Sequence, residues 1–168
     1  MEQEVFRTDG LCAQLYRCNT AIVGSGAAGY NAADCLWHAG QHDILLLTEN
    51  RLCGTSRNTG SDKQTYYKLT LSGGDGDSVR EMAQTLFNGQ CVDGDTALCE
   101  AALSAPCFLR LAELGVEFPR SRYGEYVGYK TDHDPRRRAT SAGPYTSKRM
   151  TQMLEAAVCA EGVPMLDG

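Results

Sequence analysis

Residues 20–29 of the chain read TAIVGSGAAG, an apolar run that leads directly into a GxGxxG pattern. The run Thr20–Val23 predicts a short buried strand of a parallel sheet. A helix is expected from Ala27 to Ala39, because these residues favour helices and Gly40 suits a helix end. Residues 43–48 are a second apolar run and predict a second strand. Strand, helix and strand in this short space predict a βαβ unit with a right-handed crossover.

The glycines of this stretch each have a physical task in binding a dinucleotide. Gly24 permits the tight turn, Gly26 lets the backbone approach a pyrophosphate, and Gly29 lets the helix pack close to the strand. The free N–H groups and the positive end of the helix then face the phosphates. Cofactor contacts are therefore expected from Gly24, Ser25, Gly26, Ala27, Ala28 and Gly29.

An acidic residue closes the second predicted strand. Glu49 lies twenty residues after Gly29, where its carboxylate can accept hydrogen bonds from the hydroxyls of an adenosine ribose. A 2′-phosphate would place negative charge beside this carboxylate, which disfavours NADP, although Arg51 weakens that exclusion. These features do not separate FAD from NAD, so an NAD-binding dehydrogenase domain is an alternative at this point.

The sequence resembles the succinate dehydrogenase/fumarate reductase flavoprotein family of FAD-dependent oxidoreductases, from about Cys18 to the chain end. Besides the glycine motif, the resemblance rests on LLLTEN at 45–50, CGTSRNTGSDK at 53–63, the helical stretch 77–118 and TSAGPYTSKRM at 140–150. It implies an α/β, Rossmann-like FAD/NAD(P)-binding domain with a parallel sheet, incomplete and with extra helices. It also implies that the cofactor is FAD.

In this family the loop after the second strand passes the pyrophosphate and the flavin. Respiratory members carry in this loop a His that is covalently bonded to FAD. This chain has Thr55 there and no His between His42 and His133, which implies non-covalent FAD. The resemblance implies further cofactor contacts from Thr55, Ser56, Asn58, Thr59 and Gly60.

The resemblance also implies a substrate side. Thr140 and Ser141 precede a predicted helix, where hydroxyls and a helix N-terminus suit a carboxylate, and residues 136–138 are three arginines that can add bidentate contacts. A solvated basic loop with an ordinary helix cap is an equal alternative. The implied reaction is hydride transfer between the flavin and a small substrate, and neither the substrate nor a catalytic residue can be named.

The rest of the chain predicts helices at 79–87, at 95–103, from Ser104 to before Gly115, and at 150–158, with loops at 53–62 and 72–78. Residues 163–166 can open a third strand. Residues 1–18 are interpreted as an N-terminal extension, and residues 19–168 as the N-terminal part of an FAD-binding domain, truncated before a capping domain. We therefore expect that a partner chain or a downstream segment completes the fold. Alone, the chain would be inactive or act as a non-catalytic nucleotide-binding subunit.

Composition excludes several classes of function. The net charge is −5, and Lys and Arg are interspersed among Asp and Glu. Nucleic acid is therefore not an expected partner. No apolar run is long enough to span a membrane and no signal peptide is evident, which indicates a cytoplasmic protein. The eight cysteines form no CxxC pair and are interpreted as small buried side chains. His133 lies between Asp132 and Asp134, whose carboxylates point in different directions on a regular backbone. We therefore expect no metal site.

Overall fold

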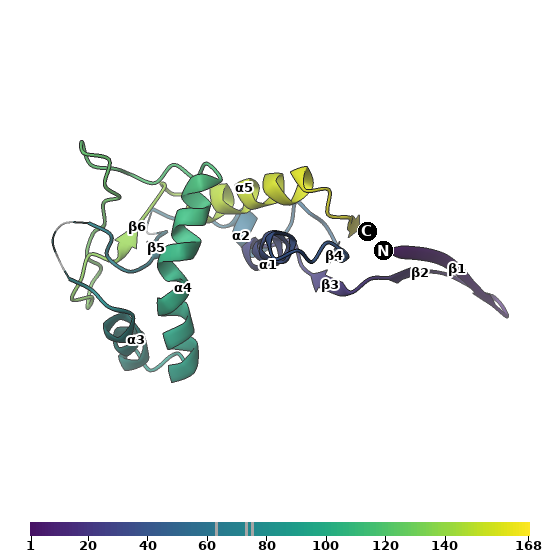
Figure 1. The fold of residues 1–168 in the computed structure, drawn as a ribbon, viewed down its shortest axis with the longest axis horizontal. Helices are drawn as coiled ribbons and strands as arrows, with labels where there is room; N and C mark the ends of the chain where they lie inside the picture. Colours follow the sequence, from purple (N-terminus) through teal and green to yellow (C-terminus); the bar gives the residue numbers. More distant parts are fainter. Residues whose placement is uncertain (63, 73, 75) are drawn as a thin grey trace. The chain divides into compact units, whose positions relative to one another are not determined.

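The computed structural model of the chain describes residues 1–62, 64–72, 74 and 76–168. They divide into two compact units, one of residues 1–59 and 150–168 and one of residues 60–149, which are described separately (Figure 1). The elements in chain order are β1 (Glu2–Thr8), β2 (Leu11–Arg17), β3 (Thr20–Val23), α1 (Ala27–His38), β4 (Ile44–Thr48), α2 (Thr55–Asn58), β5 (Tyr66–Tyr67), α3 (Val79–Asn88), α4 (Gly94–Glu113), β6 (Ala139–Thr140), α5 (Thr146–Ala160) and β7 (Met165–Asp167).

The first unit is built on a parallel sheet with the strand order β3-β4-β7. Thr20 pairs with Ile44, and Leu46 pairs with Met165, both in parallel register. The central strand β4 is the most buried, with Ile44, Leu45 and Leu46 almost inaccessible, as expected of a strand covered on both faces. The βαβ unit is confirmed, and the third strand predicted from residue 163 is present as β7.

Three helices end in the same way. After α1, Gly40 adopts a φ of 87°, its N–H donates to the Trp37 carbonyl at 3.0 Å, and the Gln41 N–H donates to Leu36 at 2.9 Å. This is a Schellman motif, in which a left-handed residue lets the chain satisfy the last carbonyls. Gly115 after α4 and Gly162 after α5 have the same role, with φ of 102° and 75°. Gly40 and Gly115 were predicted as helix ends.

Residues 1–18 form an antiparallel hairpin rather than an arm without regular structure. β1 pairs with β2 from Glu2–Arg17 to Thr8–Leu11, and most of its side chains are exposed. The turn is Asp9-Gly10, with Gly10 at a φ of 81°. An Asp-Gly pair favours the two-residue turn of a hairpin, so the sequence does carry a local signal for this element.

The second unit has two cores. One lies between α3 and α4 and contains the buried residues Met82, Ala83, Ala97 and Ala101. The other is aromatic: the ring of Phe108 lies 4.4 Å from Phe118 and 4.9 Å from Tyr126, between ring centroids. Short strands β5 and β6 pair antiparallel, and Tyr66 of β5 also packs on Phe108.

A single helix, α4, replaces the two helices predicted at 95–103 and from Ser104. Pro106 lies inside it, and Ser104 is not a cap: its hydroxyl donates to the Ala101 carbonyl at 2.8 Å and accepts the Leu69 N–H at 3.2 Å. The real N-cap is Asp93, whose carboxylate accepts the N–H groups of Asp95 and Thr96. Packing of one face of α4 against α3 outweighs the local penalty of the proline.

The prediction that the cysteines are buried is wrong for six of the eight. Cys18 and Cys107 are partly buried, and the exposed ones are Cys12, Cys35, Cys53, Cys91, Cys99 and Cys159. Most of the exposed cysteines lie on the outer faces of helices or in turns, where residue type does not decide burial. Within the described residues, no helix is both long enough and apolar enough to cross a membrane.

Candidate cofactor-binding site

The glycine turn lies between the C-terminal end of β3 and the start of α1, as predicted. Gly24 has a φ of 110°, and its N–H donates to the Leu47 carbonyl of β4 at 2.7 Å. A Cβ on Gly29 would lie 1.9 Å from the Gly24 carbonyl oxygen. Both positions therefore require glycine, one for its backbone angle and one because helix and turn touch.

The N-terminus of α1 is open. Gly26 is the N-cap residue, and among the described residues no side chain caps the helix there. The first N–H groups of α1 thus carry the positive end of the helix dipole without an internal acceptor. Beside the turn, the hydroxyls of Ser25 and Thr48 are hydrogen-bonded at 2.9 Å, which links the turn to the end of β4.

The segment predicted as a loop at 53–62 contains a one-turn helix, α2. It starts after Gly54, which has a φ of 98°. The Asn58 amide donates to the carbonyls of Leu52 and Gly54 at 2.9 and 3.1 Å, and the Thr59 hydroxyl donates to Thr55 at 2.6 Å. These side chain–backbone bonds fold the turn, which composition alone had indicated as loop.

Ser56 of α2 lies directly beside the glycine turn. Its hydroxyl oxygen is 3.3 Å from the position that a Cβ on Gly26 would occupy. The structure therefore brings Ser56 and the N-terminus of α1 together, as expected for two parts of one cofactor site. Thr55 is exposed on the same short helix.

A partly buried ion pair, which no sequence motif indicated, holds α2 in place. The guanidinium of Arg57 pairs with the carboxylate of Glu155 in α5, and the Tyr30 hydroxyl of α1 donates to the same carboxylate at 3.1 Å. Burial, together with the charge of Glu155, raises the pKa of Tyr30 to about 12, so this tyrosine remains a donor. No local pattern reveals the pair, because Arg57 and Glu155 are 98 residues apart.

The remaining predicted cofactor residues are placed as follows. Glu49 is exposed and follows β4 directly. Arg51, two residues on, donates its Nε–H to Asp167 at 3.1 Å and is therefore engaged within the first unit. Gly60 belongs to the second unit, where a Cβ would come within 2.9 Å of the Tyr145 ring.

The predicted substrate residues Thr140 and Ser141 lie in the second unit. Thr140 is fully buried in β6, and its hydroxyl donates to the Val127 carbonyl at 3.2 Å. The Ser141 hydroxyl is partly buried and lies 3.2 Å from the Thr146 hydroxyl at the start of α5. The Ser141 hydroxyl also accepts the Gly143 N–H at 3.1 Å, so both hydroxyls have internal partners, and a substrate role for either residue stays a prediction.

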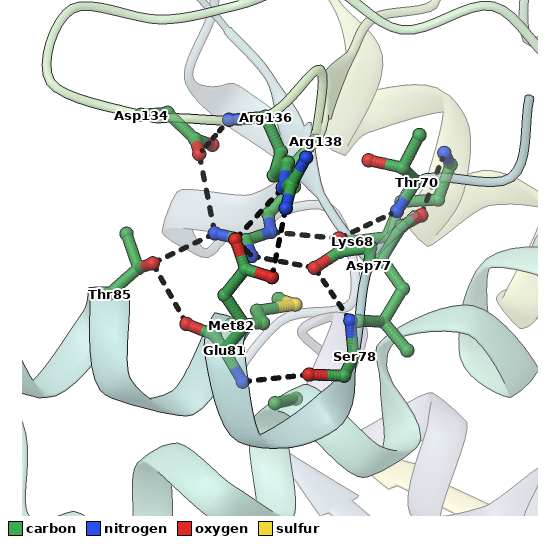
Figure 2. A network of polar contacts seen from close by, with 12 residues as sticks. Lys68, Thr70, Asp77, Ser78, Glu81, Met82, Thr85, Asp134, Arg136 and Arg138 are labelled. Atoms are coloured by element: carbon green, nitrogen blue, oxygen red, sulfur yellow. Dashed lines mark hydrogen bonds and ion pairs between the residues drawn. The ribbon is translucent and has the colours of Figure 1, made fainter. Parts of the chain in front are cut away.

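Two of the three arginines predicted as substrate partners are structural (Figure 2). Arg138 has no exposed surface; its Nε and Nη2 donate to the two oxygens of Asp77 at 2.9 and 2.7 Å, and its Nη1 donates to Asp134 at 3.3 Å. Arg136 forms a bidentate pair with Glu81 of α3. This part of the prediction is wrong, because carboxylates distant in sequence already hold both guanidinium groups.

The network changes the ionisation of Asp77. Burial alone would raise the pKa of this carboxyl, but hydrogen bonds from Arg138 and from the Thr70 and Ser78 N–H groups outweigh burial and lower its pKa to about 2. Burial alone would lower the pKa of Arg138, but its hydrogen bonds with Asp77 and Tyr67 outweigh burial and raise it. The pair is therefore a fixed charge pair of the second unit rather than a ligand site.

The donors around the turn fit an anionic diphosphate. One such donor set is the open N-terminus of α1. A second donor is the Nε of Arg57 in α2, which is buried with no hydrogen-bond partner among the described residues. A buried donor without an acceptor costs about 1–3 kcal/mol unless a ligand or water satisfies it. The uncapped N-terminus of α1 therefore offers hydrogen-bond donors at the point where phosphates would lie.

The family model described as an FAD binding domain matches residues 19–165. The chain belongs to this family of FAD-binding domains. The match covers the βαβ unit, α2 and all of the second unit, and it decides between the nicotinamide and flavin alternatives in favour of FAD. No curated protein matches the sequence.

Solved structures agree on the fold. Quinol fumarate reductase FrdA of E. coli, in a mutant form, has a TM-score of 0.75 at 16% identity over 90% of this chain. Sdh1 of Mycobacterium smegmatis, in complex with UQ1, has a TM-score of 0.66 at 14% identity over 83% of the chain. The 3-ketosteroid-delta4-(5alpha)-dehydrogenase of Rhodococcus jostii has a TM-score of 0.68 at 16% identity over 90% of the chain. The chain spans 26%, 23% and 38% of these proteins. The FAD-binding domain therefore has the fold of fumarate reductase-type flavoproteins.

Proposed function

We propose that the FAD-binding domain holds the pyrophosphate of FAD at the glycine turn between β3 and α1. The observation that supports this most directly is the open N-terminus of α1, where Gly26 is the N-cap residue and no side chain among the described residues caps the helix. Ala27 and Ala28 add N–H groups of the first turn, and Ser25 and Ser56 add hydroxyls beside it. Glu49, exposed at the end of β4, accepts hydrogen bonds from the adenosine ribose.

The proposed cofactor site continues along the short helix α2, which would lie closer to the flavin. Thr55, Asn58 and Thr59 would contact the cofactor mainly through backbone groups, since the side chains of the last two bind carbonyls of their own turn. Gly60, which follows Thr59 in the chain, is a further proposed cofactor contact. Thr55 in place of a histidine supports non-covalent attachment, because threonine offers no ring nitrogen for a bond to the flavin.

The proposed activity of the whole protein is flavin-dependent oxidoreduction. FAD supplies hydride transfer, whereas the protein binds it, orients it and excludes water. The structural relatives include a fumarate reductase and a ketosteroid dehydrogenase, which support a small substrate activated by a carboxylate or comparable group. Ser141 is the proposed substrate contact in this chain. A partner chain or further segment would supply the groups that complete the flavin pocket.

A titration tests the cofactor proposal directly. Purified protein is titrated into FAD while flavin fluorescence is followed, with ADP and NAD as competitors. We expect saturable binding of one FAD, competition by ADP and little effect of NAD. Acid precipitation should release all flavin into the supernatant, because the attachment is non-covalent. Flavin that stays with the precipitate would refute that point.

Glu49→Gln tests the ribose contact. Loss of one charge-assisted hydrogen bond should weaken FAD binding by about tenfold, equivalent to about 1.4 kcal/mol. Glu113→Gln on α4 is the matched control, since it removes an exposed carboxylate of the second unit. Equal affinities of the two variants would contradict the role of Glu49.

Binding of ADP and FAD without any reduction of the bound flavin by chemical hydride donors would favour the non-catalytic nucleotide-binding alternative.

A further inference from the structure

Three metal-ligating side chains converge in the first unit, away from the glycine turn in sequence. Asp34 and His38 stand one helical turn apart at the C-terminal end of α1, and Glu161 follows the last residue of α5. One ligand atom from each lies within 4.8 Å of the others. The Nδ1 of His38 is 3.3 Å from Glu161 Oε1 and 3.7 Å from Asp34 Oδ1.

We propose that Asp34, His38 and Glu161 form a binding site for a divalent transition-metal ion such as Zn²⁺. Zinc bonds of about 2.0–2.2 Å in tetrahedral geometry place neighbouring ligand atoms about 3.3–3.5 Å apart. The two distances from His38 Nδ1 bracket this range, so a metal requires only small side-chain shifts. Nitrogen and carboxylate oxygen are both zinc ligands, and three protein ligands leave a fourth position for water.

The electrostatic surroundings favour a cation. The side chains of Asp34 and Glu161 are only 3% and 11% exposed, so solvent would screen their attraction for a bound cation only weakly. Both helices also end at this point, and the C-terminal end of a helix carries partial negative charge. The imidazole is 57% exposed, which leaves solvent access on the side where the ion would enter.

A simpler arrangement is an ordinary helix-end hydrogen bond. His38 Nδ1 lies 2.9 Å from the Asp34 carbonyl oxygen, and in that state the ring would donate its Nδ1 proton. Metal binding at Nδ1 would require the other tautomer of the neutral ring, in which its single N–H proton is on Nε2. The hydrogen bond needs only α1, whereas the metal site also uses the carboxylate contributed by the end of α5. The two arrangements therefore differ in their dependence on Glu161.

Trp37, the sole tryptophan, adjoins His38 and serves as the reporter. The full chain is titrated with Co²⁺, whose unpaired electrons quench nearby fluorescence, and the complex is then challenged with Zn²⁺. We expect saturable quenching by one Co²⁺ per chain, reversed by Zn²⁺. His38→Ala should lower the affinity at least about tenfold, since even indirect changes at metal sites have effects of this size.

His42→Ala is the matched control, because His42 also touches Trp37, with ring centroids 4.2 Å apart, but is not one of the three ligands. It should keep the Co²⁺ affinity of the unaltered chain. Glu161→Gln should weaken binding like His38→Ala, which a hydrogen bond confined to α1 does not predict. Circular dichroism and FAD titration verify that each variant is folded.

Three results would overturn the proposal. They are non-saturable quenching, equal loss of affinity in His42→Ala, or an intense near-ultraviolet charge-transfer band that marks cysteine thiolates as the ligands. Thermal unfolding gives an independent readout. Excess Zn²⁺ should raise the Tm of the unaltered chain by several degrees and leave that of His38→Ala unchanged.

Discussion

Among the glycines of the proposed cofactor site, Gly29 has the least room for a side chain. Gly29→Ala would place a methyl group 1.9 Å from the Gly24 carbonyl oxygen, so α1 and the turn must move apart. We expect a loss of about 2 kcal/mol in the free energy of unfolding, in the usual range for overpacking, and no measurable FAD binding. Urea unfolding and FAD titration measure the two effects. Gly76→Ala, where a Cβ meets nothing within 4 Å, should leave both unchanged.

Gly26→Ala separates binding from folding. Its Cβ would meet only the flexible Ser56 hydroxyl at 3.3 Å, so stability should change by about 1 kcal/mol or less. If the pyrophosphate lies against Gly26 as proposed, the methyl group would hinder its close approach, and FAD affinity should fall by about tenfold or more. Unchanged affinity would mean that the phosphates do not lie over Gly26.

Asp77 gives the second unit an acid-sensitive component of stability. Its pKa is about 2 in the folded chain and returns to its ordinary value near 4 on unfolding, so the unfolded state binds the proton more readily. The stabilisation is complete above about pH 4 and is lost as the pH falls toward 2; for this buried carboxyl it amounts to about 2 kcal/mol. Asp77→Asn should flatten the slope of unfolding free energy between pH 4 and 2. Parallel curves for the variant and the unaltered chain would contradict this.

At the scale of the element, α4 carries an internal proline. Pro106 removes one backbone donor from the helix, which leaves the carbonyl four residues earlier without its usual partner. Pro106 is exposed, so an alanine there has room and restores the hydrogen bond. We expect Pro106→Ala to raise the free energy of unfolding by about 1–3 kcal/mol, measured by urea denaturation. A fall in stability would show that the proline acts mainly by restricting the unfolded chain.

Elements differed in how far the sequence predicted them. β3, α1 and β4 were predicted to within two residues because their periods, glycines and apolar runs are local. α4 was split in two because Ser104 and Pro106 mimic a helix start, and only packing against α3 shows otherwise. α2 was missed because its stability comes from Asn58 and Thr59 binding the backbone, which composition does not reveal.

At the scale of the whole molecule, the two units have separate cores and different reporters. Trp37 lies in the first unit, whereas the Arg138 network lies in the second. Arg138→Met leaves Asp77 and Asp134 buried without their cation and should cost the second unit about 3–5 kcal/mol. We expect the far-ultraviolet circular dichroism transition to move to lower urea while the Trp37 fluorescence midpoint stays in place.

Arg137→Met is the control for that experiment, since the neighbouring side chain is exposed and its removal should change stability by about 0.5 kcal/mol or less. If both probes shift together in Arg138→Met, the units unfold as one cooperative body and the prediction of separate transitions fails.

The sequence predicted the position of the glycine motif correctly but not the partners of the charged side chains. The glycine motif encodes its own geometry, so Gly24 to Gly29 were placed correctly at the strand–helix junction. The arginines at 136 and 138 were misassigned, because Asp77 and Glu81, their partners, lie more than 50 residues away. The ion pair of Arg57 and Glu155 was not predicted for the same reason, because these residues are 98 positions apart. Local motifs thus predict where a cofactor binds, while long-range pairing decides which charges remain available to ligands.

The exposed cysteines have a practical consequence. With six sulfur atoms at the surface and no disulfide among the eight cysteines, air oxidation should cross-link separate molecules, so purified material needs a reductant. The same thiols offer handles for dyes. If the other cysteines are replaced by serine, Cys159 in the first unit and Cys91 in the second become two labelling points. Energy transfer between them would then measure the separation of the two units and its change when flavin is added.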